Sequence, residues 1–270
     1  MGRIFSKLSR SAKTASVPRI PPELVDEVLD HLSDDMATLR TCSLVAKSWV
    51  HPSRRHIFNK VFFVAYDITR WNKTFPNPAD SPARHVRDLS FSFIQPDVPI
   101  HFADRMPYFS NVQKLTLIGR VSVNPGFISA LGRLPPSTRS VDVKFSKVPN
   151  ANIVSVMQQL PNLDNLSLMS KEWGGPIPPG TGKLIQGKLS GKLRLRRKFA
   201  HPDLLNTLME VPIGPQFAEV EIRDAWMDCF PATLELVRIC QNTLTRLHFS
   251  ALLLGNPSSS RTRNKVTELC

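Results

Sequence analysis

The sequence lacks most of the short patterns that identify an enzyme or a metalloprotein from its residues. Its four cysteines include no C-x-x-C pair, which argues against a zinc site and against a thiol redox site. Its seven histidines are scattered, with no H-E-x-x-H, and no G-x-S-x-G nucleophile elbow occurs. We therefore expect no catalytic residue, no bound metal and no cofactor.

Long apolar runs are also missing. No run approaches the roughly 20 residues that a helix needs to cross a bilayer, and no signal-peptide-like apolar segment follows the N-terminus. The cysteines are then expected to be reduced thiols, with Cys229 and Cys240 in apolar, core-like surroundings. These features favour a soluble protein of the cytoplasm and/or the nucleus.

Acidic residues are absent from two stretches, and these carry most of the formal net charge of +13. Five basic residues precede the first acid, Glu23, and seven more lie between residues 173 and 202. The rest of the chain is near neutral, so a uniform nucleic-acid-binding coat is not indicated. The second stretch, "KLSGKLRLRRK", also has no interleaved aromatic residues to stack on bases, and we expect no nucleic-acid partner.

The first basic stretch opens with "MGRIFS", which matches the N-myristoylation pattern at Gly2 and Ser6. An acyl chain there, together with the following basic residues, would favour a membrane surface. The alternative, which we prefer, is that residues 1–17 form a solvated, disordered basic tail. A membrane surface is a predicted partner only if Gly2 is acylated.

Residues 18–60 have the pattern of a small helical domain. In "IPPELVDEVLDHL", residues 20–32, the apolar stripe is wider than one packing seam requires. Ser33 is a plausible N-cap for a second helix that Pro52 would end, and residues 53–62 form a third short stretch. A unit of about 40 residues rarely buries a sufficient core alone, so this surplus predicts a partner.

This segment resembles an F-box. The resemblance lies in the Ile-Pro-Pro-Glu-Leu start, the spaced aliphatic residues and the Val-x-Lys-x-Trp-like ending at Trp49, with Ile20 replacing the usual leucine. It implies docking onto the Skp-type adaptor of a cullin–RING ubiquitin ligase. The alternative is a helical cap on the following domain. The adaptor-binding residues that the resemblance implies are Ile20, Pro21, Leu24, Val28, Leu32, Leu39, Leu44, Val45 and Trp49.

Residues 61–255 repeat a short apolar-x-apolar strand pattern. The first apolar residue of each strand recurs at spacings of 26, 26, 25, 27, 27 and 27, and Val61 lies 28 residues before the first of them. These residues are Leu89, Leu115, Val141, Leu166, Leu193, Val220 and Leu247. Helix-like stretches separate several of the strands, at residues 124–137, 150–163, 201–211 and 228–244.

The pattern resembles degenerate leucine-rich repeats, which stack into a solenoid with a parallel sheet on one side. The Asn or Cys that such repeats carry after the strand is absent, so the backbone polar groups of the turns must find other hydrogen-bond partners. The expected fold class is α plus α/β, a helical unit followed by an irregular solenoid. We expect a flexible insertion at 172–190 and a disordered tail at 256–270. The alternative is an ordinary α/β domain.

Alternation along the strands predicts which side chains face outward. Basic residues dominate this outward set, and Lys144, Lys192, Arg194 and Arg196 are the predicted substrate-binding residues. An acidic or phosphorylated protein segment would suit them. The alternative is a solvated surface with incidental charge.

The segment "GGPIPPGTGKL", residues 174–184, only superficially resembles a phosphate-binding loop. A P-loop needs glycine six residues before the lysine and Ser or Thr after it, and Ile177 and Leu184 stand there.

Taken together, the resemblances predict a non-catalytic substrate receptor whose partners are the adaptor, the cullin scaffold and an unknown protein. The alternatives are a structural interaction protein that uses the F-box only for complex assembly, and an enzyme that uses the loop at residues 174–184.

Overall fold

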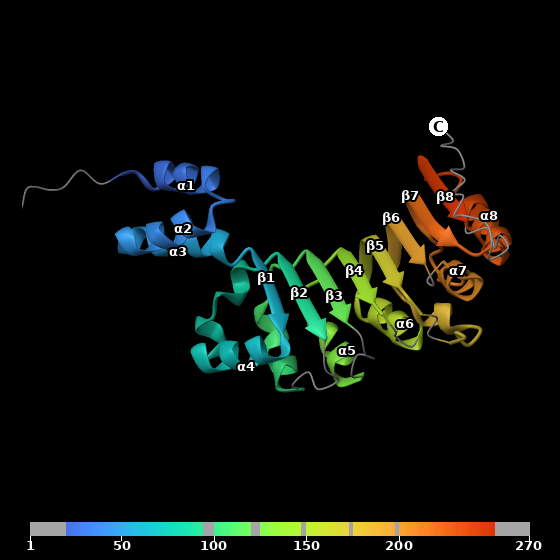
Figure 1. Cartoon of the computed structure of the whole chain (residues 1–270), viewed down its shortest axis with the longest axis horizontal. Coiled ribbons are helices and arrows are strands. Elements are labelled where there is room, and N and C mark those ends of the chain that lie inside the picture. The colour runs from blue at the N-terminus through green and yellow to red at the C-terminus, as the bar shows by residue number, and fades with distance from the viewer. Residues whose placement is uncertain are drawn as a thin grey trace, which may run out of the picture. The chain divides into compact units, whose positions relative to one another are not determined.

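The structure, a computed structural model, describes residues 20–93, 100–119, 125–146, 150–172, 175–197 and 200–251. The chain divides into two compact units, Met1–Ile57 and Phe58–Cys270, which we describe separately (Figure 1). The division lies close to the boundary predicted after residue 60. The predicted tails at 1–17 and 256–270, together with Gly2, lie outside the described residues.

The helical unit contains α1 (Pro22–His31), α2 (Met36–Val45) and α3 (Lys47–Ile57). Asp35, not the predicted Ser33, is the N-cap of α2, and its carboxylate accepts hydrogen bonds from the backbone N–H groups of Ala37 (3.1 Å) and Thr38 (3.0 Å). These bonds satisfy two of the amide groups that a helix start leaves open. The hydrogen bonds from Thr38 also hold the pKa of Asp35 below its usual value.

The prediction of a second helix running on to Pro52 is wrong. Ala46 has extended backbone angles (φ −154°, ψ 153°), which end α2 at Val45 and redirect the chain. The third helix starts at Lys47 and continues through Pro52 to Ile57. Proline removes one helical hydrogen bond here without ending the helix.

The core of this unit is small. Its fully buried apolar residues are Val25, Leu29 and Leu39, with Leu32, Cys42, Trp49 and Ile57 packed partly against them. An ion pair from Arg55 of α3 to Asp30 of α1 (3.3 Å) links two of the helices at the surface.

The second unit is an α/β unit built on one eight-stranded, fully parallel sheet, in which each strand lies beside its predecessor in the chain. The register aligns Val61 with all seven residues that the repeat spacing singled out, so each predicted strand and its alignment are confirmed. The strands are β1 (Lys60–Val64), β2 (Asp88–Phe93), β3 (Lys114–Gly119), β4 (Ser140–Phe145), β5 (Asn162–Ser170), β6 (Lys188–Arg197), β7 (Gln216–Ala225) and β8 (Arg246–Ala251).

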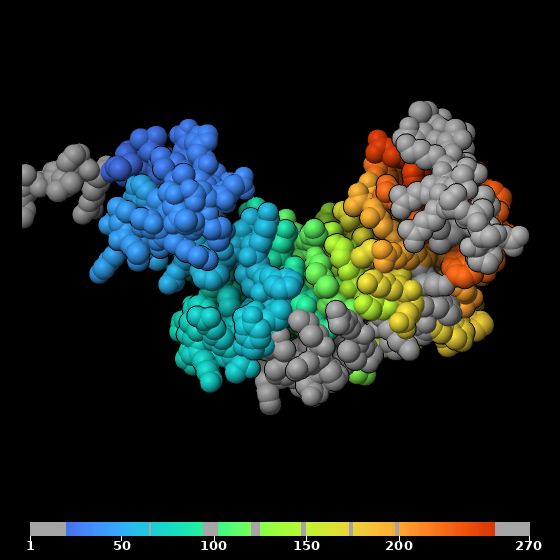
Figure 2. All heavy atoms as spheres, viewed as in Figure 1, coloured from blue at the N-terminus to red at the C-terminus, as the bar shows by residue number. Residues whose placement is uncertain are grey.

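Helices lie on one face of this sheet, and no helix in the described part of the unit lies on the other face (Figure 1). The α-helices are α4 (Ala65–Thr74), α5 (Pro125–Leu131), α6 (Asn150–Gln159), α7 (Pro202–Met209) and α8 (Phe230–Ile239). The last four are the predicted ones. 3-10 helices complete the connections: η1 (Pro78–Asp80), η2 (Pro82–His85), η3 (Ile100–Tyr108), η4 (Thr181–Leu184) and η5 (Met227–Cys229). In the space-filling view, atoms of successive repeats touch along the unit (Figure 2).

Apolar strand residues pack against these helices. The core is aromatic in the first half, where Phe63 lies near Trp71 (ring centroids 5.2 Å apart) and Phe91 lies near Phe127 (5.0 Å). Gly119 stands between Phe93 and Phe145 in the register, and a Cβ there would lie 2.7 Å from the Phe93 carbonyl oxygen. Because glycine leaves this space open, the two rings stack across it at 6.2 Å.

Hydroxyl groups join successive repeats where the strands begin. Thr138 donates to the Val112 carbonyl oxygen (3.1 Å), and Thr245 donates to that of Ala218 (2.9 Å). Each bond reaches back one repeat, 26 and 27 residues respectively. The same two carbonyl oxygens also accept from the Ser137 hydroxyl (3.0 Å, to Val112) and from the Thr245 backbone N–H (2.8 Å, to Ala218), so each is bonded twice to the following repeat.

The prediction of a flexible insertion at 172–190 is corrected over residues 175–190. Ile177 and Ile185 are buried, and Leu189 belongs to β6, whose first residue is Lys188. Glu210 accepts hydrogen bonds from the backbone N–H groups of Gly180 and Gly182, both 3.2 Å long. Burial and these bonds give the segment a fixed place in the stack.

Gly191 allows β5 and β6 to approach at a bulge, and its replacement tests the packing of the stack. Its φ is +66°, and a Cβ would lie 2.1 Å from the Asp164 carbonyl oxygen. Gly214 (φ +72°) is a matched control, because a Cβ there meets nothing within 4 Å. We expect Gly214→Ala to lower the free energy of unfolding by about 1 kcal/mol. Gly191→Ala should cost at least about 2 kcal/mol more, since β5 must shift.

The measurement is urea-induced unfolding of the full chain followed by circular dichroism. Equal losses in the two variants would show that the close approach to Asp164 contributes nothing beyond the left-handed backbone.

Candidate binding surfaces

The apolar stripe of α1 is divided between the inside and the outside of the helical unit. Val25 and Leu29 are buried, whereas Leu24 and Val28 are 50% and 45% exposed. Each pair is spaced four residues apart, so each lies along one side of the helix. The outer side is therefore apolar without being needed for the core.

Other predicted docking residues are exposed as well. Ile20 and Pro21 precede α1 and are exposed, and Leu44 and Val45 close α2 with exposed fractions of 85% and 66%. Scattered apolar residues on a surface are ordinary, whereas a concentration of them on so small a unit is typical of an interaction surface.

Three predicted docking residues lie further inside. Leu32 and Trp49 are intermediate in exposure and pack partly on the core. Leu39 is fully buried, so its prediction as a docking residue is corrected. It faces Val25 and Leu29 within the unit and supports the outer surface from beneath.

The bare face of the sheet is a second candidate surface. On β2 and β4 side chains alternate strictly between intermediate and buried, as predicted for one covered and one open face. A shallow hollow of about 110 Å³ lies on this face across β3 to β6. Its polar lining consists of Lys114, Ser140, Asp142, Asn165, Ser167, Lys192 and Arg194.

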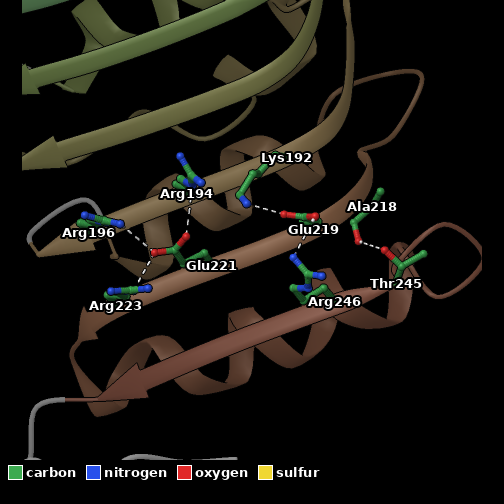
Figure 3. A network of polar contacts seen from close by, with 9 residues as sticks. All are labelled: Lys192, Arg194, Arg196, Ala218, Glu219, Glu221, Arg223, Thr245 and Arg246. Carbon is green, nitrogen blue, oxygen red and sulfur yellow. Dashed lines mark hydrogen bonds and ion pairs between the residues drawn. The ribbon is translucent and has the colours of Figure 1, made fainter. Parts of the chain in front are cut away.

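Next to this hollow, an ion-pair network crosses β6, β7 and β8 (Figure 3). We call it the charge cluster; its members are Lys192, Arg194, Arg196, Glu219, Glu221, Arg223 and Arg246. Glu221 is only 8% exposed and lies at its centre. Its carboxylate accepts from Arg194 Nε (3.1 Å) and Arg196 Nη2 (2.8 Å), and Arg223 Nε lies 2.6 Å away. Glu219 pairs with Lys192 and, at 3.3 Å, with Arg246.

These contacts keep both glutamates ionised. Burial of the Glu221 carboxyl works to raise its pKa, but the hydrogen bond from Arg196 and the neighbouring positive charges outweigh it, so the pKa is lower than usual. The hydrogen bond from Lys192 lowers the pKa of Glu219 in the same way. The cluster thus holds five cations and two carboxylates, a net charge of +3.

The four predicted substrate-binding cations are not all in one place, and each has an internal partner. Lys192, Arg194 and Arg196 belong to the charge cluster, whereas Lys144 pairs with Asp142 on β4 (2.6 Å). Sequence reasoning missed the carboxylates as site residues. The repeat spacing contained the signal, because aligning the strands puts Glu219 beside Lys192 and Glu221 beside Arg194.

The glycine-rich segment at 174–184 does not offer a phosphate site in its described part. A phosphate-binding loop presents unpaired backbone N–H groups to the ligand. Here the Glu210 carboxylate already accepts from Gly180 and Gly182, and the side chain of Leu184 is exposed where a P-loop would hold Ser or Thr.

The described residues contain no cluster of metal-ligating side chains, with no three of His, Cys, Asp and Glu gathered as ligands would be. Cys229 and Cys240 are buried, as predicted, and burial raises the pKa of both thiols, to about 11 for Cys229. Within the same described ranges, no helix has the length and apolar character needed to cross a bilayer.

Comparison with known proteins adds no identity: no protein-family model matches the chain, and a search of curated proteins also found no match.

The carboxylate of Glu221 should stabilise the sheet unit in a pH-dependent way. Its pKa in the folded chain lies below the ordinary value of 4.5. The stabilisation is therefore complete above about pH 4.5 and is lost as the pH falls through the lower folded value. We expect Glu221→Gln to lower the free energy of unfolding by about 1–2 kcal/mol at pH 7, because three partly exposed guanidinium groups lose their counter-ion.

The difference between the wild type and Glu221→Gln should shrink as the pH is lowered below 4.5, which urea unfolding at several pH values would measure. Glu235→Gln, which removes an exposed ion pair with Arg238 on α8, is the control and should change the stability little. A pH-independent loss in Glu221→Gln would show that the charge of the carboxylate is not the source of its effect.

Proposed function

We propose that this protein is a non-catalytic substrate receptor of a cullin–RING ubiquitin ligase, with an F-box at residues 18–60 and an irregular leucine-rich-repeat-like domain after it. The observation that carries the proposal is the divided apolar stripe of α1, which exposes Leu24 and Val28 while Val25 and Leu29 fill the core. A sequence with the F-box pattern would place these residues against the Skp-type adaptor.

The size of the exposed apolar surface supports a docking role for the helical unit. Among its described residues, 20–57, three apolar side chains are buried, and a larger number are exposed. Burying an exposed Leu or Val contributes about 1 kcal/mol or more to binding. Covering this surface would therefore stabilise both the complex and the unit itself.

The sheet unit supports the repeat assignment. Parallel strands follow one another in chain order at an almost constant spacing, and the helices that the structure describes in this unit lie on one face (Figure 1). An ordinary doubly wound α/β domain covers both faces of its sheet. The irregular feature is the variable connection, which is an α-helix in some repeats and a 3-10 turn in others.

The mechanism that follows is proximity. One unit fixes the protein to the ligase, the bare sheet face holds a target, and lysines of the target meet the ubiquitin-loaded conjugating enzyme at high effective concentration. No residue of this chain needs to take part in bond formation. Such a protein would work in the cytoplasm or the nucleus.

Changing the outer side of α1 tests the docking surface. We expect Leu24→Asp and Leu44→Asp each to weaken adaptor binding by at least about 100-fold, because each would bury an unpaired carboxylate in an apolar contact. Both side chains are exposed in the isolated chain, so the fold should persist. Leu184→Asp, which changes a 63% exposed leucine of the sheet unit, is the matched control and should bind like the wild type.

Binding would be measured with purified Skp-type adaptor by calorimetry, alongside thermal melting of every variant. Wild-type binding by a correctly folded Leu24→Asp variant would refute this docking surface. Co-purification from cells, with and without proteasome inhibition, then separates a ligase receptor from a structural interaction protein, because only a receptor has a target whose abundance depends on it.

A further inference from the structure

We propose that the three guanidinium groups around Glu221 bind the phosphoryl group of a phosphoserine or phosphothreonine in an extended segment of a protein partner. The identification of that partner as a ligase target rests on the proposed function, whereas the phosphoryl site rests on the charge cluster alone. The contact would lie on the bare face of β6 and β7.

The charge around Glu221 matches a phosphate monoester. Arg194, Arg196 and Arg223 contribute three positive charges against the one negative charge of Glu221. The remaining charge of +2 complements a phosphate monoester, which carries about −1.5 to −2 near neutral pH. A peptide carboxylate would neutralise only half of it.

The guanidinium groups are also held in place with donors to spare. Arg194 and Arg223 each use Nε at Glu221, and no other acceptor in the described part of the chain takes their Nη hydrogens. Their side chains are 44% and 47% exposed, so these donors can be reached from solvent. Arg196 Nε also lacks a hydrogen-bond partner but is buried, so the reachable donors are those of Arg194 and Arg223. An arginine fork fixed by a carboxylate loses little further freedom when it binds a phosphoryl oxygen.

The backbone at the same end of the two strands is unusual. Arg197 (φ 61°) and Asp224 (φ 56°) directly follow Arg196 and Arg223, and both have left-handed backbone angles without being glycine. The Asp224 N–H donates to Ser250 Oγ of β8 (3.3 Å), which helps to hold this conformation. Such strained positions cluster at ligand-binding sites.

The surroundings favour a peptide over a nucleic acid. The hollow on β3 to β6 reaches Lys192 and Arg194 and presents the side chains of Ser140, Asn165 and Ser167, which suit a polar residue next to the phosphoresidue. The outward pairs around Glu221 in the register of β6 and β7 contain only charged residues, and none is an aromatic residue that could stack on a base: Lys192 with Glu219, Arg194 with Glu221, and Arg196 with Arg223. The three arginines around Glu221 also form one site that suits a single phosphate group, whereas a nucleic-acid backbone makes a row of phosphate contacts.

The test uses the full-length chain and three fluorescein-labelled nonapeptide libraries with mixed flanks and a central phosphoserine, serine or glutamate. Fluorescence anisotropy at 0.15 M salt measures binding. We expect the phosphoserine library to bind at least about tenfold more tightly than the glutamate library, and the serine library not to bind measurably.

Single substitutions connect this binding to the cluster. Arg196→Ala and Arg223→Ala should each weaken phosphopeptide binding about tenfold. Arg223→Lys should weaken it by less than Arg223→Ala, because lysine keeps the positive charge but lacks the two-pronged guanidinium group. Arg238→Ala removes an exposed arginine from an ion pair on α8 and should leave binding unchanged. Thermal melting identifies any variant that fails to fold, and Arg223, with the most exposed side chain of the three, is then the deciding position.

The proposal is overturned if the phosphoserine and serine libraries bind equally. It is also overturned if Arg238→Ala weakens binding as much as Arg223→Ala, or if a single-stranded RNA dodecamer binds more tightly than the phosphopeptides. Leu24→Asp should bind the phosphopeptides normally and Arg223→Ala should bind the adaptor normally, so this proposal and the docking proposal can fail separately.

Discussion

The constant register between neighbouring parallel strands is the constraint on which the rest of the sheet unit depends. Because Val61 and its seven counterparts lie in one row, the apolar side chains stack on one face and leave the other face to the residues between them. A shift by one residue in any strand would expose that strand's apolar side chains. The hydrophobic core and the composition of the bare sheet face are thus set by the same alignment.

The charge cluster is a direct consequence of this alignment. Two adjacent strands bring Lys192 beside Glu219 and Arg194 beside Glu221, although these pairs are far apart in the sequence. The carboxylates reduce the repulsion among the cations and fix the arginine side chains in position. An isolated set of arginines would carry more charge but would be less ordered, and the partly buried glutamates provide order at a moderate net charge.

Much of this architecture could be predicted from the sequence, because strand alternation and repeat spacing are local signals. The spacing located every strand, and apolar periodicity located α5 to α8. The apolar periodicity did not locate α4, "AYDITRWNKT", whose apolar pattern is weaker. The break at Ala46 and the burial of Leu39 depend on how the helices pack, which no local pattern specifies. The cap at Asp35 is instead a local choice between two plausible capping residues, Ser33 and Asp35. The pairing of Lys144 with Asp142 likewise needed side-chain positions.

Linear stacking gives the sheet unit a property that a globular core lacks. Each repeat touches mainly the repeats beside it, so the free energy is approximately a sum of neighbour-to-neighbour terms. Those terms differ along the stack: interlocking rings join the first repeats, whereas aliphatic contacts and a bulge at Gly191 join the later ones. The charge cluster is itself built across β6, β7 and β8, so it exists only while these neighbouring strands stay together, and local unfolding of β7 and β8 would remove it while leaving the aromatic contacts of the first repeats in place.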